Sequence, residues 1–360
     1  MSTAIVTSTA SVLYDRGLVN TNTVIRARAP LRISFVGGGT DLPHYYEEHG
    51  GAVLSSTINR YAFATLRPRN DDAIRITALD GGQTATYHLG DDDSDSDGVF
   101  DLVRAVIRRV GVNKGFDLDL RSDAPRGSGL GGSSAMTAAI LAALIEYLGV
   151  VLDSYEIAEL NYTVERLDLG IAGGKQDQYA TTFGGFNLIE FSKDRVDVTP
   201  LRLPAHVLND LEHHLILCYT GKIRPTLGLV ESRVHAYQRG DNKVLDGMHR
   251  LHRMVYEAKE FLLKGRLHDF GELLDEGMTN KKKMNPHVST PFIDELYETA
   301  KRSGAIGGKL LGAGGGGYLL LMVSDRCRFQ VIESLQKSGG VITDFSFQDR
   351  GFNAWRSRSL

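Results

Sequence analysis

The stretch Pro125-Arg126-Gly127-Ser128-Gly129-Leu130-Gly131-Gly132-Ser133-Ser134-Ala135 places four glycines and a serine pair directly before the apolar run 136–148. This order predicts a loop that opens into the N-terminus of a buried helix. Unpaired backbone N–H groups and the positive end of the helix dipole meet there and favour a bound phosphate. Glycine suits such a loop because a side chain would block close approach of the backbone. We therefore predict a phosphate-binding loop, in which Ser133 and Ser134 either cap the helix or turn a hydroxyl toward a metal-bound phosphate.

Two other interpretations of this stretch compete. One is a structural glycine-rich turn with an ordinary serine cap. The other is a dinucleotide fingerprint, because Gly127, Gly129 and Gly132 satisfy G-x-G-x-x-G. The preceding segment 116–121, however, alternates apolar and polar residues, as a half-exposed antiparallel strand does, whereas a first Rossmann strand is usually apolar throughout. The Walker motif G-x-x-x-x-G-K-[ST] is absent from the sequence, so an unusual phosphate loop is favoured.

Composition narrows the class of protein. A chain of 360 residues is long enough for two domains, and a net charge of −3 gives no reason to expect nucleic acid or an anionic membrane as partner. Cys218 and Cys327 are too few for a disulfide framework or a zinc cluster, and both fall in apolar, strand-like runs, which predicts buried free thiols in a reducing cytosol. No apolar run approaches the roughly 18 residues of a membrane span. Residues 1–23 lack the pattern of a secretory signal and predict a loosely ordered extension, so a cytoplasmic location is expected.

Periodicity and turn residues give a coarse outline of the elements. Residues 170–185 and 304–317 are expected to be turn-rich, and the acidic segment 91–97 a solvated loop rather than a calcium loop. Strands are expected at 24–36, 52–67, 73–79, 116–121, 186–191, 215–219 and 318–323, and helices at 100–110, 136–148, 155–167, 244–263 and 291–303. With a domain boundary near 194–204, this mixture of antiparallel strands and helices predicts an α+β fold.

A second candidate site combines Glu165-Arg166 with Gly173-Gly174-Lys175-Gln176-Asp177-Gln178-Tyr179. Asp177 lies among glycines just past a helix, where a carboxylate can face a substrate hydroxyl, and Lys175 is expected to stabilise its charge. Glu165 can reach a magnesium ion bridging nucleotide phosphates, because Mg²⁺ usually takes only one or two protein carboxylates. A surface carboxylate and an Asx-type turn remain the structural alternative.

A third candidate is Lys309-Leu310-Leu311-Gly312-Ala313-Gly314-Gly315-Gly316-Gly317, in which five of the last six residues are glycine. This density predicts tight backbone packing against the phosphate loop, a substrate or only a neighbouring strand. A purely structural hairpin is equally compatible with it.

Together with Ala29-Pro30-Leu31-Arg32-Ile33-Ser34-Phe35-Val36-Gly37-Gly38-Gly39-Thr40-Asp41, these motifs occur in an order that resembles the GHMP small-molecule kinases, from about residue 24 to the end. The resemblance implies a two-domain α+β fold: a ribosomal protein S5 domain 2-like N-terminal domain over 24–200, which binds ATP, and a ferredoxin-like C-terminal domain over 201–360. Within the family, Gly-Gly-Lys-Gln-Asp-Gln-Tyr-Ala and Asn280-Lys281-Lys282-Lys283-Met284 look most like the heptose 7-phosphate kinase branch. Gly38 and Gly39 replace the Glu and His of the galactokinase motif, which argues against galactokinase.

The resemblance also implies residue roles. Asp177 matches the catalytic aspartate with Arg32 beside it, Glu165 and either Ser133 or Ser134 match the magnesium ligands, and Asp41 matches a sugar-hydroxyl contact. A sugar that already carries phosphate needs a cationic pocket, for which the lysine triplet 281–283 with Lys222 and Arg224 is the candidate, against the alternative of a solvated surface. The further residues expected at the substrate are Gly38, Gly39, Thr40, Gly173, Gly174, Lys283, Gly314 and Gly315.

The reaction that this resemblance implies is transfer of the γ-phosphoryl group of ATP, with Mg²⁺, to the anomeric hydroxyl of D-glycero-D-manno-heptose 7-phosphate. A sister kinase for fucose or another heptose, and a catalytically silent binding protein of the same fold, remain as alternatives. The expected partners are ATP and a small sugar phosphate, and a homo-oligomer is left open.

Overall fold

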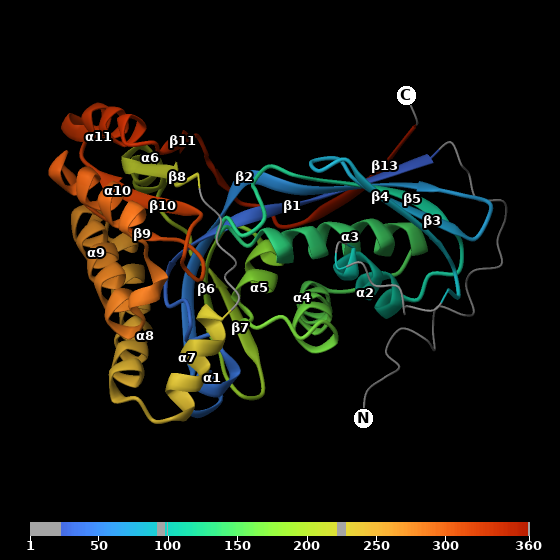
Figure 1. Ribbon diagram of the computed structural model, residues 1–360, viewed down its shortest axis with the longest axis horizontal. Helices are drawn as coiled ribbons and strands as arrows, with labels where there is room; N and C mark the ends of the chain where they lie inside the picture. The colour runs from blue at the N-terminus through green and yellow to red at the C-terminus, as the bar shows by residue number, and fades with distance from the viewer. Residues whose placement is uncertain (1–22, 92–97, 99, 222–227, 359–360) are drawn as a thin grey trace.

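The computed structural model describes residues 23–91, 98, 100–221 and 228–358 (Figure 1). Its strands are β1 (Thr23–Val36), β2 (Gly51–Pro68), β3 (Ala73–Ala78), β4 (Gln83–His88), β5 (Phe116–Ser122), β6 (Phe186–Phe191), β7 (Val196–Pro200), β8 (Leu215–Tyr219), β9 (Ala305–Leu310), β10 (Tyr318–Val323), β11 (Val341–Thr343), β12 (Phe347–Gln348) and β13 (Asn353–Arg358). Its helices are α1 (Pro43–His49), α2 (Asp101–Val110), α3 (Gly132–Leu148), α4 (Ser154–Tyr162), η3 (Thr163–Asp168), α5 (Gln176–Phe183), α6 (Ala205–His214), α7 (Leu229–Gln238), α8 (Asn242–Leu263), α9 (Leu267–Met284), η4 (Pro286–Val288), α10 (Pro291–Arg302) and α11 (Asp325–Lys337).

The larger sheet is built around β1 and β2. Its described strands run in the order β13-β1-β2-β5-β3-β4, and the long strand β2 also pairs with β6 and β12. Strand β5 alternates buried and half-buried residues and is antiparallel to β2, as the sequence pattern predicts, although it also runs parallel to β3. Helix α3 packs against β1 and β2 and lies along one face of this sheet (Figure 1).

The last strands of the chain return to this first sheet. β13 pairs antiparallel with β1, from Thr23 opposite Arg358 to Arg28 opposite Asn353, and β12 pairs with β2. The expected C-terminal domain over 201–360 therefore needs a correction at its end, because residues 347–358 belong to the N-terminal sheet. The physical reason is that β1 would otherwise present an unpaired edge.

The smaller sheet has the order β11-β8-β10-β9, with every neighbouring pair antiparallel. Along the chain its strands and helices follow a β-α-β-β-α-β sequence, which is the ferredoxin-like arrangement that was expected. Helices α9, α10 and α11 pack against this sheet at one end of the molecule, and α8 packs on α9 and on strands β1 and β2 (Figure 1). One apolar cluster joins the two sheets, since it contains Ile25 of β1, Leu217 of β8 and Met248 of α8. The α+β fold is thus confirmed.

The helix expected over 155–167 changes type along its length. Helix α4 ends at Tyr162 and continues as the π-helical η3, whose i→i+5 bonding shifts the face that each later residue occupies. Leu167, the last residue of the expected helix, is 67% exposed, whereas Glu165 is fully buried. The π turn therefore directs a carboxylate, and not a leucine, into the protein.

Other differences concern glycine-rich segments and one cysteine. The segments expected to be turn-rich contain helix α5 and strand β9, because their short regular elements are flanked by glycines that dominate the local pattern. Cys218 is a buried free thiol as predicted, but Cys327 is only half-buried and lies on helix α11. Within the described chain, no helix is long and apolar enough to span a membrane. The expected extension over residues 1–22 and most of the acidic segment 91–97 lie outside the described residues.

Candidate active site

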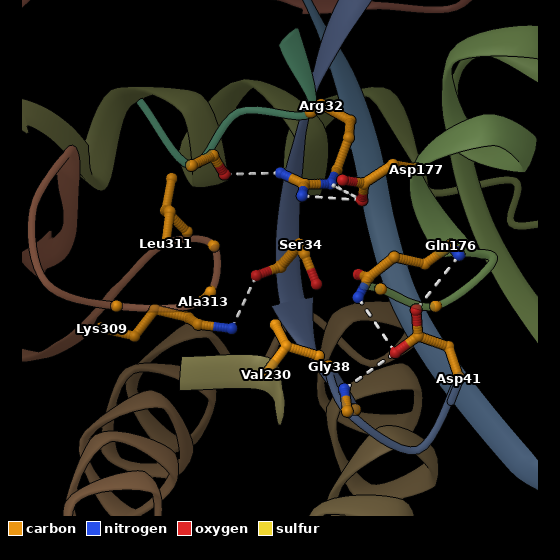
Figure 2. Close-up of a pocket in the computed structure, with 18 of the residues that line it drawn as sticks. Arg32, Ser34, Gly38, Asp41, Gln176, Asp177, Val230, Lys309, Leu311 and Ala313 are labelled. Carbon is orange, nitrogen blue, oxygen red and sulfur yellow. Dashed lines mark hydrogen bonds and ion pairs between the residues drawn. The ribbon is translucent and has the colours of Figure 1, made fainter. Parts of the chain in front are cut away.

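A cavity of about 290 Å³ lies where the two domains meet. Its walls come from the end of β1, the phosphate loop, the segment 171–177, helices α8 and α9, and the glycine loop between β9 and β10. All three sequence motifs therefore meet at one place. Figure 2 shows side chains from these separate segments directed into the same space.

Asp177 and Arg32 form an ion pair at this cavity. The Arg32 side chain is nearly buried and donates from Nε and Nη2 to Asp177 Oδ1, each at 2.7 Å, while its Nη1 donates to the carbonyl oxygen of Gly129 at 2.7 Å. One guanidinium thus fixes both the carboxylate and the phosphate loop (Figure 2). Asp177 keeps 22% of its side chain exposed, so its carboxylate remains reachable from the cavity.

The Glu165 carboxylate lies under the N-terminus of α3. It accepts hydrogen bonds from the Ser133 hydroxyl, from the Ser134 hydroxyl at 2.5 Å, and from the Gln178 amide at 2.5 Å. Helix α3 starts at Gly132 and has Gly131 as its N-cap, so the serines do not cap it and instead turn their hydroxyls to Glu165. Of the two alternatives for these serines, the capping role is therefore wrong.

This arrangement suits a magnesium ion. Glu165 is fully buried, and the closest cation that pairs with it in the described chain is Arg166, whose Nη2 lies 3.9 Å from Oε2. A buried carboxylate needs a compensating charge, and a single carboxylate with hydroxyl oxygens beside a phosphate loop is a donor set that Mg²⁺ accepts. The residues present therefore fit the metal.

The phosphate loop packs directly on the glycine loop between β9 and β10. A Cβ atom added to Gly129 would lie 2.6 Å from the Leu311 carbonyl oxygen, and one added to Gly317 would lie 2.2 Å from that of Ser128. The Tyr318 N–H donates to the Ser128 carbonyl at 3.1 Å. Of the three partners proposed for this glycine motif, the structure thus identifies the phosphate loop, and the motif also forms the β9–β10 hairpin.

Asp41 is buried at the opposite wall. Its carboxylate accepts from the Gly39 N–H at 2.8 Å and from the Gln176 N–H and side-chain Nε2, both at 3.2 Å. Burial, with a smaller contribution from Asp177, raises the pKa of Asp41 above its usual value. A carboxyl held in this way can contact a sugar hydroxyl, as the resemblance implies.

Two predicted roles are corrected by the geometry. Lys175 does not contact Asp177: its Nζ donates to Glu159 at 2.7 Å and lies over the Tyr162 ring. The reason is that Lys175 precedes α5 and its side chain leaves the cavity, so Arg32 alone pairs with Asp177 among the described residues. Thr40 is fully buried and donates from Oγ1 to the carbonyls of Gly37 and Ala52, which gives it a structural role in the turn.

The basic pocket is also placed differently from the prediction. Lys283 is exposed and is not part of the cavity wall, and Lys222 and Arg224 lie outside the described residues. Lys281 of the same triplet does line the cavity, where it donates to the Leu310 and Gly312 carbonyls. The helical period explains this difference, since residues 281 and 283 fall on different faces of α9.

The remaining predicted residues divide between the cavity wall and its supports. The cavity is lined by Gly38, Gly39, Gly127, Ser128, Gly129, Gly131, Gly132, Gly173, Gly174 and Gly314, whereas Pro125, Leu130 and Gly315 do not line it. Ser34, Arg166, Gln176 and Lys309 also line the cavity; each lies within one of the sequence motifs, but none of them was given a role from the sequence. Strand alternation could have found Ser34, because it lies two residues from Arg32 on β1 and so shares its face. No comparable signal pointed to the side chains of Gln176 or Lys309.

Burial and charge set the state of Lys309. Its Nζ donates to the carbonyls of Ser34 at 2.7 Å and Phe35 at 2.8 Å (Figure 2). Desolvation at this wall, with repulsion from Arg32, lowers the pKa of Lys309 to about 7. This side chain therefore links the second domain to the end of β1.

Comparisons with known proteins agree with this geometry. Models of the GHMP kinases N terminal domain and of the GHMP kinases C terminal match residues 98–185 and 258–340. The chain is 36% identical to a D-glycero-alpha-D-manno-heptose 7-phosphate kinase of Campylobacter jejuni, over 92% of this chain and 99% of that protein. It is 27% identical to a bifunctional fucokinase/GDP-fucose pyrophosphorylase of Arabidopsis thaliana, over 83% of this chain and 30% of that protein.

Among solved structures, a D-glycero-D-manno-heptose 1-phosphate kinase from Bacteroides thetaiotaomicron is similar, with a TM-score of 0.78, 34% identity, and coverage of 93% of this chain and 100% of that one. The likeness extends over nearly the whole length of both the Campylobacter and the Bacteroides proteins. The chain therefore belongs to the GHMP kinases.

Proposed function

We propose that this chain transfers the γ-phosphoryl group of ATP to the anomeric C1 hydroxyl of D-glycero-D-manno-heptose 7-phosphate, in a cytoplasmic reaction that requires Mg²⁺. The observation that carries the proposal is the Arg32 guanidinium, which fixes the Asp177 carboxylate and the phosphate loop relative to each other. A proton acceptor and a phosphate cradle held by one side chain suit phosphoryl transfer to a hydroxyl. The name of the Campylobacter relative supports the choice of acceptor.

In this mechanism Asp177 orients the acceptor hydroxyl and takes its proton. The hydroxyl oxygen then forms a bond to the γ-phosphorus while the bond from that phosphorus to the leaving ADP oxygen breaks. The backbone N–H groups of the phosphate loop bind the phosphates at the start of α3. Because phosphoryl transfer has a loose transition state, positioning and charge neutralisation contribute more than the base itself.

Glu165 would hold the magnesium ion, together with the Ser133 hydroxyl. Both serines line the cavity, and Ser133 is the better candidate because it is exposed, whereas Ser134 is buried. When bound, the metal supplies positive charge that neutralises the phosphate oxygens.

The acceptor phosphate needs cations that line the cavity. Arg166 and Lys281 both do so, and their described hydrogen-bond partners are mainly carbonyl oxygens. We propose these two side chains as phosphate contacts in addition to Lys222 and Arg224, whereas Lys283 lies outside the cavity wall. The two named heptose kinases differ in the carbon that carries phosphate, so the regiochemistry needs a direct test.

The test is ADP release with MgATP and a panel of heptose 7-phosphate, heptose 1-phosphate, free heptose, fucose, mannose and galactose, followed by phosphorus NMR of the product. Selective turnover of heptose 7-phosphate with a new C1 phosphate is expected. Turnover of fucose alone would replace the acceptor but keep the kinase chemistry. ATP binding without turnover of any sugar would support the silent binding protein instead.

A further inference from the structure

Three buried polar atoms of the cavity wall have no hydrogen-bond partner among the described residues. One is the Ser128 hydroxyl in the phosphate loop, where the phosphates of ATP would bind; the other two are the Ser34 hydroxyl on β1 and the side-chain oxygen Oε1 of Gln176 at the start of α5. Ser34 is only 5% exposed. Buried polar atoms in folded proteins are nearly always hydrogen-bonded, so the two exceptions outside the phosphate loop require an explanation.

Each of the two side chains is held in place by its neighbours. The Gln176 amide nitrogen donates to Asp41 Oδ1 at 3.2 Å, and because a carboxylate only accepts, the amide oxygen must face away from Asp41. The backbone of Ser34 is fixed by Lys309, whose Nζ donates to the Ser34 carbonyl. Figure 2 shows Ser34 and Gln176 approaching the same space from β1 and from α5.

Gly38 leaves this space open. A Cβ atom added to Gly38 would lie 3.5 Å from Gln176 Nε2 and 3.7 Å from Ser34 Oγ, which are ordinary van der Waals distances. A side chain at this position would therefore cover both polar atoms without a clash. The glycine at position 38 leaves the two atoms facing an unfilled part of the cavity.

Ser55 is another unpartnered hydroxyl, and it serves as the comparison for Ser34 because it is away from the cavity. It lies directly opposite Ser34 in the β1–β2 ladder, is fully buried, and also has no hydrogen-bond partner in the described part of the chain. Unlike Ser34, it does not line the cavity. The two serines thus form a matched pair that differs in access to the cavity.

We propose that Ser34 Oγ and Gln176 Oε1 are specificity-determining contacts that each bind one hydroxyl group of a polyhydroxylated acceptor. This inference rests on the proposed function and deepens it, because it states which groups of the chain, in addition to Asp41, recognise the hydroxyl groups of the sugar. Both oxygens accept hydrogen bonds from hydroxyls, and Asp41 positions Gln176 for this contact. Acceptors that lack either hydroxyl leave a buried oxygen unpaired and bind more weakly.

The experiment uses the full chain and a series of single-deoxy analogues of the acceptor that the wild type phosphorylates. In Ser34→Ala, kcat/KM for the parent acceptor is expected to fall about 3- to 10-fold, which corresponds to one hydrogen bond. With the wild type, one particular deoxy analogue should have a lower kcat/KM than the parent acceptor. With Ser34→Ala, the same analogue and the parent acceptor should have equal kcat/KM. A different analogue should show the same pattern with Gln176→Leu.

The matched control is Ser55→Ala, which should leave kcat/KM for every analogue as in the wild type. Gly38→Ala should raise KM for the acceptor and leave KM for ATP unchanged, because the added methyl group covers both oxygens. Equal responses of Ser34→Ala and Ser55→Ala would overturn the inference, since the effect would then come from the strand pair. It is likewise overturned when neither Ser34→Ala nor Gly38→Ala changes KM for the acceptor.

Failure of the proposed function gives a different result. Wild-type enzyme that phosphorylates a sugar other than heptose 7-phosphate removes the acceptor assignment, and the deoxy series of that sugar then decides the inference. Wild-type enzyme that phosphorylates no sugar overturns both.

Discussion

Asp177 and Arg32 lie 145 residues apart in the chain and meet in an ion pair whose two bonds are both 2.7 Å long. In Asp177→Asn the shape of the side chain is kept, but its ability to accept the proton of the acceptor hydroxyl is lost. We expect kcat to fall by about 10²- to 10⁴-fold, the usual contribution of a general base. The measurement is steady-state ADP release with saturating acceptor.

ATP affinity is the internal control for this variant. Asp177 contacts Arg32 and not the backbone of the phosphate loop, so equilibrium binding of ATP should remain within about twofold of the wild type. Wild-type turnover by Asp177→Asn would remove Asp177 from the mechanism.

At this scale the sequence identified residue types better than partners. Asp177 and Asp41 line the cavity and Glu165 lies behind its serine wall, but Lys175, the nearest cation in sequence to Asp177, bonds Glu159 instead. Arg32 takes its place because β1 runs beside the phosphate loop, as the hydrogen bond from the Arg32 N–H to the Leu130 carbonyl shows. Sequence proximity therefore gave the wrong partner for a carboxylate at the start of a helix.

At the scale of elements, the phosphate loop depends on glycines with different tasks. Gly129 has a φ of +84° and meets the Leu311 carbonyl, whereas Gly132 has open space around its added Cβ and begins α3. We expect Gly129→Ala to lower the free energy of unfolding by more than about 1 kcal/mol, because a side chain is strained there and displaces the glycine loop. Thermal and urea unfolding measure this loss.

Gly132→Ala is the matched variant in the same loop. Alanine is favoured over glycine in a helix, so stability should be unchanged or slightly higher. A loss of stability in Gly132→Ala equal to that in Gly129→Ala would mean that the close packing of the two loops is not what makes Gly129 necessary.

The elements that position the carboxylates were harder to predict. The π turn η3 that buries Glu165 interrupts the helix expected over 155–167, whose sequence remains periodic and gives no sign of the change. Helix α5, which carries Asp177 in its first turn, follows two glycines and a lysine that indicate a turn. In both places, contacts with α3 or β1 determine the backbone conformation, and the local sequence pattern does not.

At the scale of the whole molecule, Lys309 joins the second domain to β1, and its pKa of about 7 makes this link sensitive to pH. Between pH 7 and the ordinary lysine pKa of 10.5, the unfolded chain binds a proton that the folded chain lacks. Stability from this group must therefore rise with pH in that window, by at most about 1.4 kcal/mol per pH unit.

Lys309→Met removes the titrating amine and, with it, this dependence of stability on pH. The difference in unfolding free energy between wild type and Lys309→Met should shift in favour of the wild type as pH increases from 7 to 9, measured by urea unfolding at each pH. Lys337→Met is the control, because Lys337 is 72% exposed and pairs only with Glu333 one helical turn away among the described residues. If the difference in unfolding free energy between wild type and Lys309→Met stays constant from pH 7 to 9, burial does not lower the pKa of Lys309.

Glycine spacing and strand alternation are local properties of the sequence, and they were sufficient to predict an α+β fold with a phosphate loop. The kinase prediction came from the resemblance of the motifs, in their order, to the GHMP kinases. The local patterns located β1, β5 and α3, and the resemblance supplied the roles proposed for Asp177 and Glu165. Only the tertiary structure decided that β13 closes the edge of β1, that Lys175 pairs with Glu159 and not with Asp177, and that the Ser34 and Gln176 oxygens at the cavity have no partner among the described residues. The reason is physical: each of these contacts joins segments that are distant in sequence, and nothing in a local pattern specifies which distant surface will cover it.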